Sequence, residues 1–281
     1  MPVAVVTDST AYLPPSAYAA MAVVVPLTVV INGVEGSEGV DVTPIEVARA
    51  LGGRRVSVTT SRPSPAAFAD VYRRLLDEGA SAVVSVHLSA QLSGTVEAAR
   101  LAAAEIGPAV SVVDAKSTGM GLGFPALAAS EAARRGEDAD AVQRAAAEAA
   151  ERTSTLFYVD TLEFLRRGGR INAASALLGT ALSVKPILHV VDGGIVVRDK
   201  VRTASRGLAR LVDLAVEAAG DDDVDVAVHH LDGADRADQL AVSLKERLGE
   251  RLRDSYVTEI GAAVAAHVGP GLASVVVHRR S

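Results

Sequence analysis

The stretch from Ala82 to Arg100 most constrains the fold, because within it the chain passes from an apolar strand through a polar loop into a helix. The strand is predicted at 82–88, where valines alternate with Ser85 and His87. From Val96 onward, apolar residues recur at helical spacing. A strand that leads through a short loop into a helix is the repeating unit of α/β proteins.

The loop between this strand and this helix concentrates groups that can hydrogen-bond a ligand. They are the side chains of Ser89, Gln91, Ser93 and Thr95. The first turn of a helix also presents free backbone N–H groups and the positive end of the helix dipole, which favour an anion or a carboxylate. Gly94 would let such a ligand approach the backbone closely. The alternative is that Ser93 or Thr95 only caps the helix, and on this stretch alone capping is the favoured interpretation.

The rest of the chain continues the alternation of strands and helices. Two hairpins are predicted, at Asn32-Gly33 and at Asp192-Gly193-Gly194, because primed turns need positive φ angles. Thr43, Pro44 and Glu46 form a capping box at the start of a further helix. Strands are expected at 3–7, 23–31, 34–40, 111–114, 156–159, 184–191, 195–198, 224–229, 254–259 and 274–277. Further helices are expected at 65–78, 126–135, 139–152, 161–166, 173–182, 204–218 and 236–248.

This order of elements predicts an α/β protein with two α/β domains. The sequence pattern changes near Thr153, so we place an N-terminal domain at 1–153 and a C-terminal domain at 154–281. In the first domain, strands followed by helices predict a mostly parallel sheet flanked by helices. In the second, the hairpin at Asp192 introduces antiparallel pairing, which predicts a mixed sheet.

Composition excludes several classes of partner and site. The formal net charge is -6 and only short basic pairs occur, so nucleic acid is not expected as a partner. The chain has no cysteine, and its six histidines lack the spacing of metal motifs, so no metal site is expected. The longest apolar run, 21–31, is too short to span a bilayer. With no signal-peptide pattern at the start, we expect a cytoplasmic protein without stable membrane insertion.

Nucleotide and hydrolase motifs are also incomplete. In the segment from Gly119 to Phe124, Phe124 stands where a dinucleotide fingerprint needs its third glycine, and helix packing is the better interpretation. No phosphate-binding loop is present, so no cofactor is expected. Ser93 lies outside a Gly-x-Ser-x-Gly elbow. A serine-dependent lipid or ester hydrolase, with Ser93 as nucleophile and His267 as base, stays as the alternative function.

Several short segments together resemble one family. They are Val6-Thr7-Asp8-Ser9-Thr10, Thr60-Ser61-Arg62-Pro63-Ser64, Leu92-Ser93-Gly94-Thr95, the stretch from Leu162 to Ile171 with Gly168-Gly169-Arg170, Lys185-Pro186-Ile187 and His267-Val268-Gly269-Pro270-Gly271. In this order, and nearly from end to end, the chain resembles the DegV proteins, which include the fatty-acid-binding subunits of bacterial fatty acid kinase. One departure is Arg62, where the family usually has glutamine.

The resemblance implies a lipid-binding carrier of bacterial phospholipid metabolism and not an enzyme. It implies that one long-chain fatty acid lies in a buried tunnel, and that Thr60 and Ser93 hold its carboxylate at the interface of the two domains. An ATP-dependent fatty acid kinase is the implied partner, which would convert the bound acid into an acyl phosphate. The residues implied near the head group or facing the kinase are Ser61, Arg62, Gly94, Thr95, Arg170 and His267.

Elementary energetics fits this division of roles between tail and head group. Burying about 15 methylenes at ~0.8 kcal/mol each contributes on the order of 12 kcal/mol before ordering costs. A buried carboxylate must be hydrogen-bonded, which hydroxyls and free helix N–H groups can do. Candidate apolar lining for the tail is the helix expected at 173–182, together with Phe124, Phe157 and Phe164. For each of these residues taken singly, ordinary core packing is the better interpretation.

Overall fold

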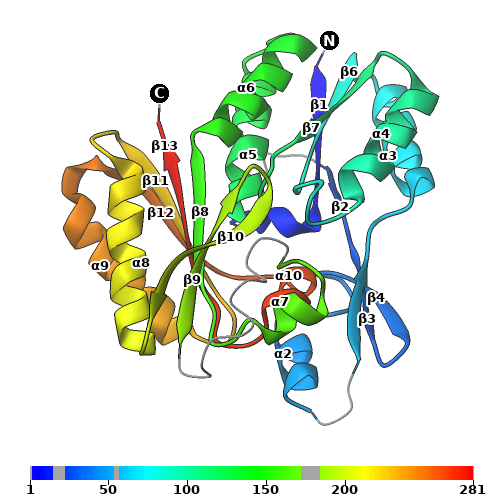
Figure 1. Ribbon diagram of the computed structural model, residues 1–281. Coiled ribbons are helices and arrows are strands. Elements are labelled where there is room, and N and C mark those ends of the chain that lie inside the picture. The colour runs from blue at the N-terminus through cyan, green and yellow to red at the C-terminus, as the bar shows by residue number, and fades with distance from the viewer. Residues whose placement is uncertain (1, 15–22, 54–56, 172–183, 281) are drawn as a thin grey trace. The chain divides into compact units, whose positions relative to one another are not determined.

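The computed structural model describes residues 2–14, 23–53, 57–171 and 184–280 (Figure 1). The chain divides into two compact units, one comprising Met1–Thr28 and Ser61–Glu151 and the other Val29–Thr60 and Arg152–Ser281. The division expected from the sequence, 1–153 and 154–281, assigned residues 29–60 to the first domain. Their contacts group them with the second unit instead.

The first unit contains a four-stranded parallel sheet in the order β2-β1-β6-β7. Its strands are β1 (Val3–Asp8), β2 (Val23–Val25), β6 (Ala82–His87) and β7 (Val110–Asp114). The short helix η1 (Ser9–Ala11) follows β1 directly. The helices are α3 (Pro65–Asp77), α4 (Thr95–Ile106), α5 (Met120–Arg134) and α6 (Ala139–Glu151). This is the mostly parallel, helix-flanked sheet that the sequence predicted.

The helices α3 and α4 bury one apolar face against this sheet. Phe68 and Tyr72 from α3, and Ala98 and Ala102 from α4, pack in one buried cluster with strand residues such as Val83. Side chains three and four positions apart share a helix face, so this spacing explains why the two helices lie on the sheet.

The second unit contains a six-stranded sheet in the order β10-β9-β8-β13-β11-β12. Its strands are β8 (Thr153–Tyr158), β9 (Lys185–Val191), β10 (Gly194–Val201), β11 (Val224–His230), β12 (Leu252–Glu259) and β13 (Ala273–Arg279). Only the β11–β12 pair is parallel, which confirms the predicted mixed sheet. The helices α8 (Ala204–Ala219) and α9 (Ala234–Leu248) contribute to the buried cluster on one face of this sheet, and η3 (Gly249–Arg251) follows α9.

Residues 28–61 supply a small sheet in the order β4-β3-β5, built from β3 (Thr28–Ile31), β4 (Val34–Ser37) and β5 (Val58–Ser61). The helix α2 (Pro44–Gly52) begins at Thr43 with both hydrogen bonds of the predicted capping box. It packs against α10 (Ala262–Val268). The buried Glu38 side chain accepts a hydrogen bond from the Ala263 N–H at 2.8 Å, which fixes the start of α10.

Local turn signals were accurate, whereas some element limits were not. The hairpin turns have the predicted positive φ angles, for example 52° at Asn32 and 85° at Gly33. The strand expected at 23–31 is broken at Pro26, and its halves join different sheets. The helix α5 begins at Met120, six residues before the expected start, so the glycine-rich segment is indeed helical. The helix α10 was not predicted. The helix expected at 173–182 lies outside the described residues.

Candidate functional site

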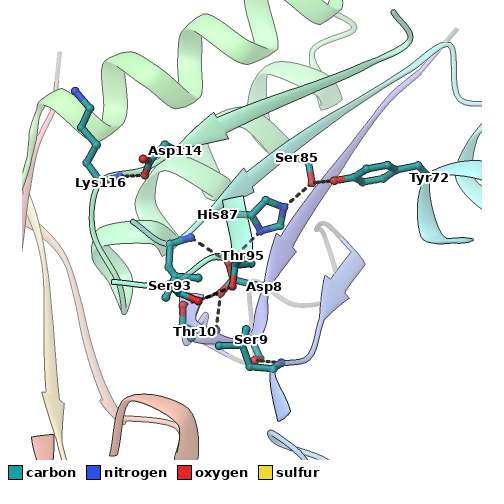
Figure 2. Close-up of polar contacts among 12 residues, drawn as sticks. Asp8, Ser9, Thr10, Tyr72, Ser85, His87, Ser93, Thr95, Asp114 and Lys116 are labelled. Carbon is teal, nitrogen blue, oxygen red and sulfur yellow. Dashed lines mark hydrogen bonds and ion pairs between the residues drawn. The ribbon is translucent and has the colours of Figure 1, made fainter. Parts of the chain in front are cut away.

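The carboxyl ends of β1 and β6 carry a buried cluster of polar side chains (Figure 2). Asp8 is fully buried, and its Oδ1 atom accepts hydrogen bonds from the Thr10 N–H at 3.0 Å and the Thr10 hydroxyl at 2.6 Å. Its Oδ2 atom accepts from the Leu88 N–H and lies against His87 Nδ1, both at 3.0 Å. A buried carboxylate is tolerated only when it is satisfied in this way, so Asp8 holds the ends of both strands together.

A directed chain of hydrogen bonds ends on this carboxylate. The Tyr72 hydroxyl donates to Ser85 Oγ at 2.8 Å, and Ser85 Oγ lies 2.7 Å from His87 Nε2. If the Ser85 hydroxyl donates to Nε2, a neutral His87 carries its proton on Nδ1 and donates it to Asp8. Every member then has a partner, which favours this tautomer. Burial raises the pKa of Tyr72 to about 12, so its hydroxyl stays a donor.

Ser85, His87 and Asp8 therefore have the connectivity of a hydrolytic triad, but they are not placed to act as one. All three side chains are completely buried, and Ser85 already accepts the Tyr72 proton. A nucleophile must reach its substrate, so this group is structural. Sequence reasoning did not identify the cluster. The available signal was two polar residues, Ser85 and His87, on the same face of an otherwise apolar strand.

The loop after β6 presents the hydroxyl of Ser93. Backbone hydrogen bonds from Ser93 N to Ser89 O and from Ser89 N to Ser117 O, at 3.0 and 2.9 Å, give this loop its shape. Ser93 Oγ lies 2.9 Å from Thr95 Oγ1. Gly94 is the N-cap of α4, which receives no side-chain capping bond. The interpretation that Ser93 or Thr95 caps the helix is therefore wrong, because these hydroxyls bond to each other.

In the second unit, Thr60 at the end of β5 meets His267 at the end of α10. Thr60 Oγ1 lies 2.8 Å from His267 Nε2. Burial, helped by the positive charge of Arg170, lowers the pKa of His267 to about 4, so the ring is neutral at pH 7. Within the part of the chain that the structure describes, the buried Nδ1 atom has no hydrogen-bond partner. The contact between Thr60 and His267 unites two residues that sequence reasoning assigned to one head group.

Three glycines allow close packing around His267. A Cβ atom on Gly168 would overlap His267 Nδ1, one on Gly269 would overlap the Phe164 ring, and one on Gly271 would overlap Asp160. The segment around α7 (Glu163–Arg167) and the turn after α10 therefore interlock at close range. Arg170 is held at the end of the same segment, where it donates a hydrogen bond to the Gly168 carbonyl.

The predicted site residues thus form two groups. Ser93, Gly94, Thr95 and Arg62 belong to the first unit, where the Arg62 side chain lies against Gly94, and Ser61 is exposed in the same unit. Thr60, Arg170 and His267 belong to the second unit. His267, which the hydrolase alternative needs as a base, has its Nε2 atom in contact with Thr60. Among the described residues, no three His, Asp or Glu side chains gather as a metal site would require.

The depressed histidine pKa values predict a pH-dependent stability. His229, His267 and His278 each have a pKa lowered to about 4, mainly by burial, against about 6.5 in the unfolded chain. The unfolded chain therefore binds more protons between these values, and stability falls as the pH is lowered from about 6.5 to 4. Each histidine contributes a slope of up to ~1.4 kcal/mol per pH unit.

Urea unfolding at half-unit pH steps measures this slope. We expect His267→Gln to reduce this slope by up to ~1.4 kcal/mol per pH unit, because unfolding would then take up about one proton fewer. A slope that His267→Gln leaves unchanged would show that this ring is not buried in its neutral form.

Comparison with known proteins identifies the family. The family model described as "Uncharacterised protein, DegV family" matches residues 2–280. A DegV domain-containing protein of Streptomyces coelicolor is 51% identical over 279 residues, covering 99% of both chains. The chain belongs to the DegV family. A DegV domain-containing protein of Mycobacterium tuberculosis is 41% identical over 279 residues, covering 99% of this chain and 97% of its own.

Solved DegV structures share the whole fold. A DegV family protein from Thermus thermophilus, described by its fatty acid binding, superposes with a TM-score of 0.91 at 32% identity and full coverage of both chains. DegV from Bacillus subtilis, described as a fatty acid binding protein, gives 0.89 at 29% identity, again over all of both chains. In the described part of this DegV chain, no helix is both long and apolar enough to cross a bilayer.

Proposed function

We propose that this protein binds one long-chain fatty acid and presents its carboxylate to a separate ATP-dependent fatty acid kinase. The observation that supports this most is its full-length likeness to the DegV proteins of Thermus thermophilus and Bacillus subtilis, both described as binding fatty acid. A third, from Streptococcus agalactiae, carries the same description at a TM-score of 0.90.

In this proposal the carboxylate accepts hydrogen bonds from the hydroxyls of Thr60 and Ser93. A neutral His267 that donates its Nε2 proton to Thr60 Oγ1 leaves the Thr60 proton free to point at the ligand. Likewise, the Thr95 hydroxyl can donate its proton to Ser93 Oγ, 2.9 Å away, which leaves the Ser93 proton free to point at the ligand. Each hydroxyl is therefore oriented by a neighbour before the ligand arrives, which lowers the entropic cost of binding.

The acyl tail is proposed to lie in a buried apolar tunnel and to supply most of the affinity. Phe124 and Phe157 are buried apolar side chains, and Phe164 is partly buried. Burial of ~15 methylenes would contribute about 12 kcal/mol before ordering costs, far more than one hydrogen bond. The head group then decides orientation, because only one end of the ligand can satisfy the hydroxyls.

The kinase, and not this chain, is proposed to supply the ATP. A carboxylate oxygen would form a bond to the γ-phosphorus while the bond from that phosphorus to the bridging oxygen breaks, giving an acyl phosphate and ADP. This chain would hold the acid with its carboxylate accessible and keep the tail out of water. Its carrier role accords with a sequence that lacks a phosphate-binding loop.

Lipid analysis of the purified protein tests the proposal directly. We expect organic extraction and mass spectrometry to find about one fatty acid per chain, and the delipidated protein to bind oleate or palmitate. Absence of both would overturn the proposed function. Labelling of Ser93 by a fluorophosphonate probe, with accompanying esterase activity, would support the hydrolase alternative instead.

Substitution of the two hydroxyls tests the head-group assignment. We expect Ser93→Ala and Thr60→Ala each to weaken oleate binding about 10-fold, because a charged acceptor loses a donor. Thr60→Ser should retain most of the affinity, and Ser205→Ala, which alters an exposed hydroxyl of the second unit, should change nothing. Calorimetric titration of the single and double variants measures whether the two effects are coupled. Unchanged affinity in Ser93→Ala would remove Ser93 from the site.

A further inference from the structure

Arg62 lies against Gly94, the residue that follows Ser93 in the chain. Its Cδ, Cζ and Nη1 atoms lie so close to Gly94 that a Cβ atom there would overlap the guanidinium group. Gly94 is the residue between Ser93 and Thr95, whose hydroxyls contact each other at 2.9 Å. The Arg62 side chain therefore lies against the backbone of the loop whose Ser93 hydroxyl is proposed to bind the carboxylate.

Among the residues that the structure describes, no acidic side chain pairs with the positive charge at this position. Arg62 is exposed, and across the described ranges no hydrogen bond or ion pair engages its side chain. Other arginines of the same unit do have acidic partners, since Arg73 pairs with Asp70 and Arg135 with Glu131. A guanidinium placed against the backbone but without an acidic partner can offer its donors to an oxygen-rich anion.

We propose that Arg62 makes this chain favour the doubly charged head group of an acyl phosphate over the carboxylate of the free fatty acid. This inference rests on the proposed function, because it takes the loop of Ser93 as the head-group site. A carboxylate carries one negative charge, whereas a phosphate group carries close to two above its second pKa of about 6. One fixed cation therefore attracts the phosphorylated form more strongly at the same distance.

The expected consequence is that this chain keeps the acyl phosphate bound after it has formed. The planar guanidinium can also donate two parallel hydrogen bonds to a phosphate, which a neutral side chain at this position cannot do. Because Arg62 is exposed, salt should screen the attraction, so the preference should shrink as ionic strength rises. An acyl phosphate would thereby stay bound, shielded from water, until an acceptor for the acyl group removes it.

Paired titrations of two lipids test this role. Oleyl phosphate serves as a hydrolytically stable dianionic probe at pH 8, and oleate serves as the monoanionic one. We expect Arg62→Gln to weaken oleyl phosphate binding about 10-fold and oleate binding by no more than about 2-fold, at 50 mM salt. At 500 mM salt the difference between the two lipids should largely disappear.

Arg74→Gln is the matched control, because it removes one exposed positive charge from α3 of the same unit. It should leave both affinities unchanged, and Arg62→Lys should give an intermediate preference. Equal urea midpoints for all variants show that folding is intact. An Arg62→Gln protein with an unaltered affinity ratio would overturn this inference alone. A wild-type protein that binds neither lipid would overturn the proposed function together with it.

Discussion

Asp8→Asn should lower the free energy of unfolding by about 3 kcal/mol, a large share of the stability of a typical domain. The substitution preserves shape but turns one acceptor oxygen into a donor. That atom would then face the donors of Leu88, His87 or Thr10, all of which need an acceptor. Urea unfolding at pH 7.5, monitored by circular dichroism, measures the loss.

The effect of Asp8→Asn should also reach the ligand, because the Leu88 N–H that Asp8 holds begins the loop of Ser93. Asp70→Asn is the control, since that carboxylate is 78% exposed and, among the described residues, its one ion pair is with Arg73, whose side chain is 49% exposed. It should change stability by less than about 0.5 kcal/mol. Equal midpoints for Asp8→Asn and the wild type would mean that the buried network around Asp8 contributes nothing to the fold.

Gly269→Ala should be the second most disruptive change, costing about 2–5 kcal/mol in stability. Its φ of 73° with ψ of 175° belongs to a backbone region that only glycine occupies readily. The added methyl would also overlap the Phe164 ring. Because Phe164 lies on α7 and Gly269 follows His267 by two residues, relief of the overlap would move the imidazole from Thr60. Urea unfolding and oleate titration measure the two consequences.

Gly249→Ala separates the backbone cost from the steric one. Gly249 also has a glycine-type backbone, with φ 58° and ψ -131°, but nothing lies within 4 Å of an added Cβ atom. We expect it to cost about 1–3 kcal/mol and to leave oleate affinity unchanged. If Gly269→Ala matched Gly249→Ala in both measurements, the contact with Phe164 would have no role in positioning His267.

Features set by neighbouring residues were predictable in detail. The capping box at Thr43 and the turn at Asn32-Gly33 depend on groups only a few residues apart, so the chemistry is fully present in the local sequence. The parallel sheet of the first unit was also predictable, because strands joined through helices leave few other arrangements. The DegV resemblance named Thr60 and His267 as head-group residues, and that role stays a prediction; their 2.8 Å contact was not itself predicted.

Other features had no local signal. Asp8 and His87 are 79 positions apart in the chain, and nothing near either residue announces the other. The break of the expected strand at Pro26 was visible as a residue type, but the choice of a different sheet for each half was not. The helix α10 is short and rich in alanine, so its apolar residues show no periodicity that would separate it from a loop.

The sequence by itself determined most of the elements and their order, the class of the two larger sheets and the family to which the chain belongs. Tertiary structure alone decided which polar groups meet, namely Asp8 with His87 and Thr60 with His267, and it alone placed the Arg62 side chain against Gly94. The physical reason is the distance along the chain over which each kind of interaction acts. Helix caps and turns are satisfied within a few residues, whereas a buried charge or hydroxyl takes whichever partner the packing of distant strands brings within hydrogen-bonding distance.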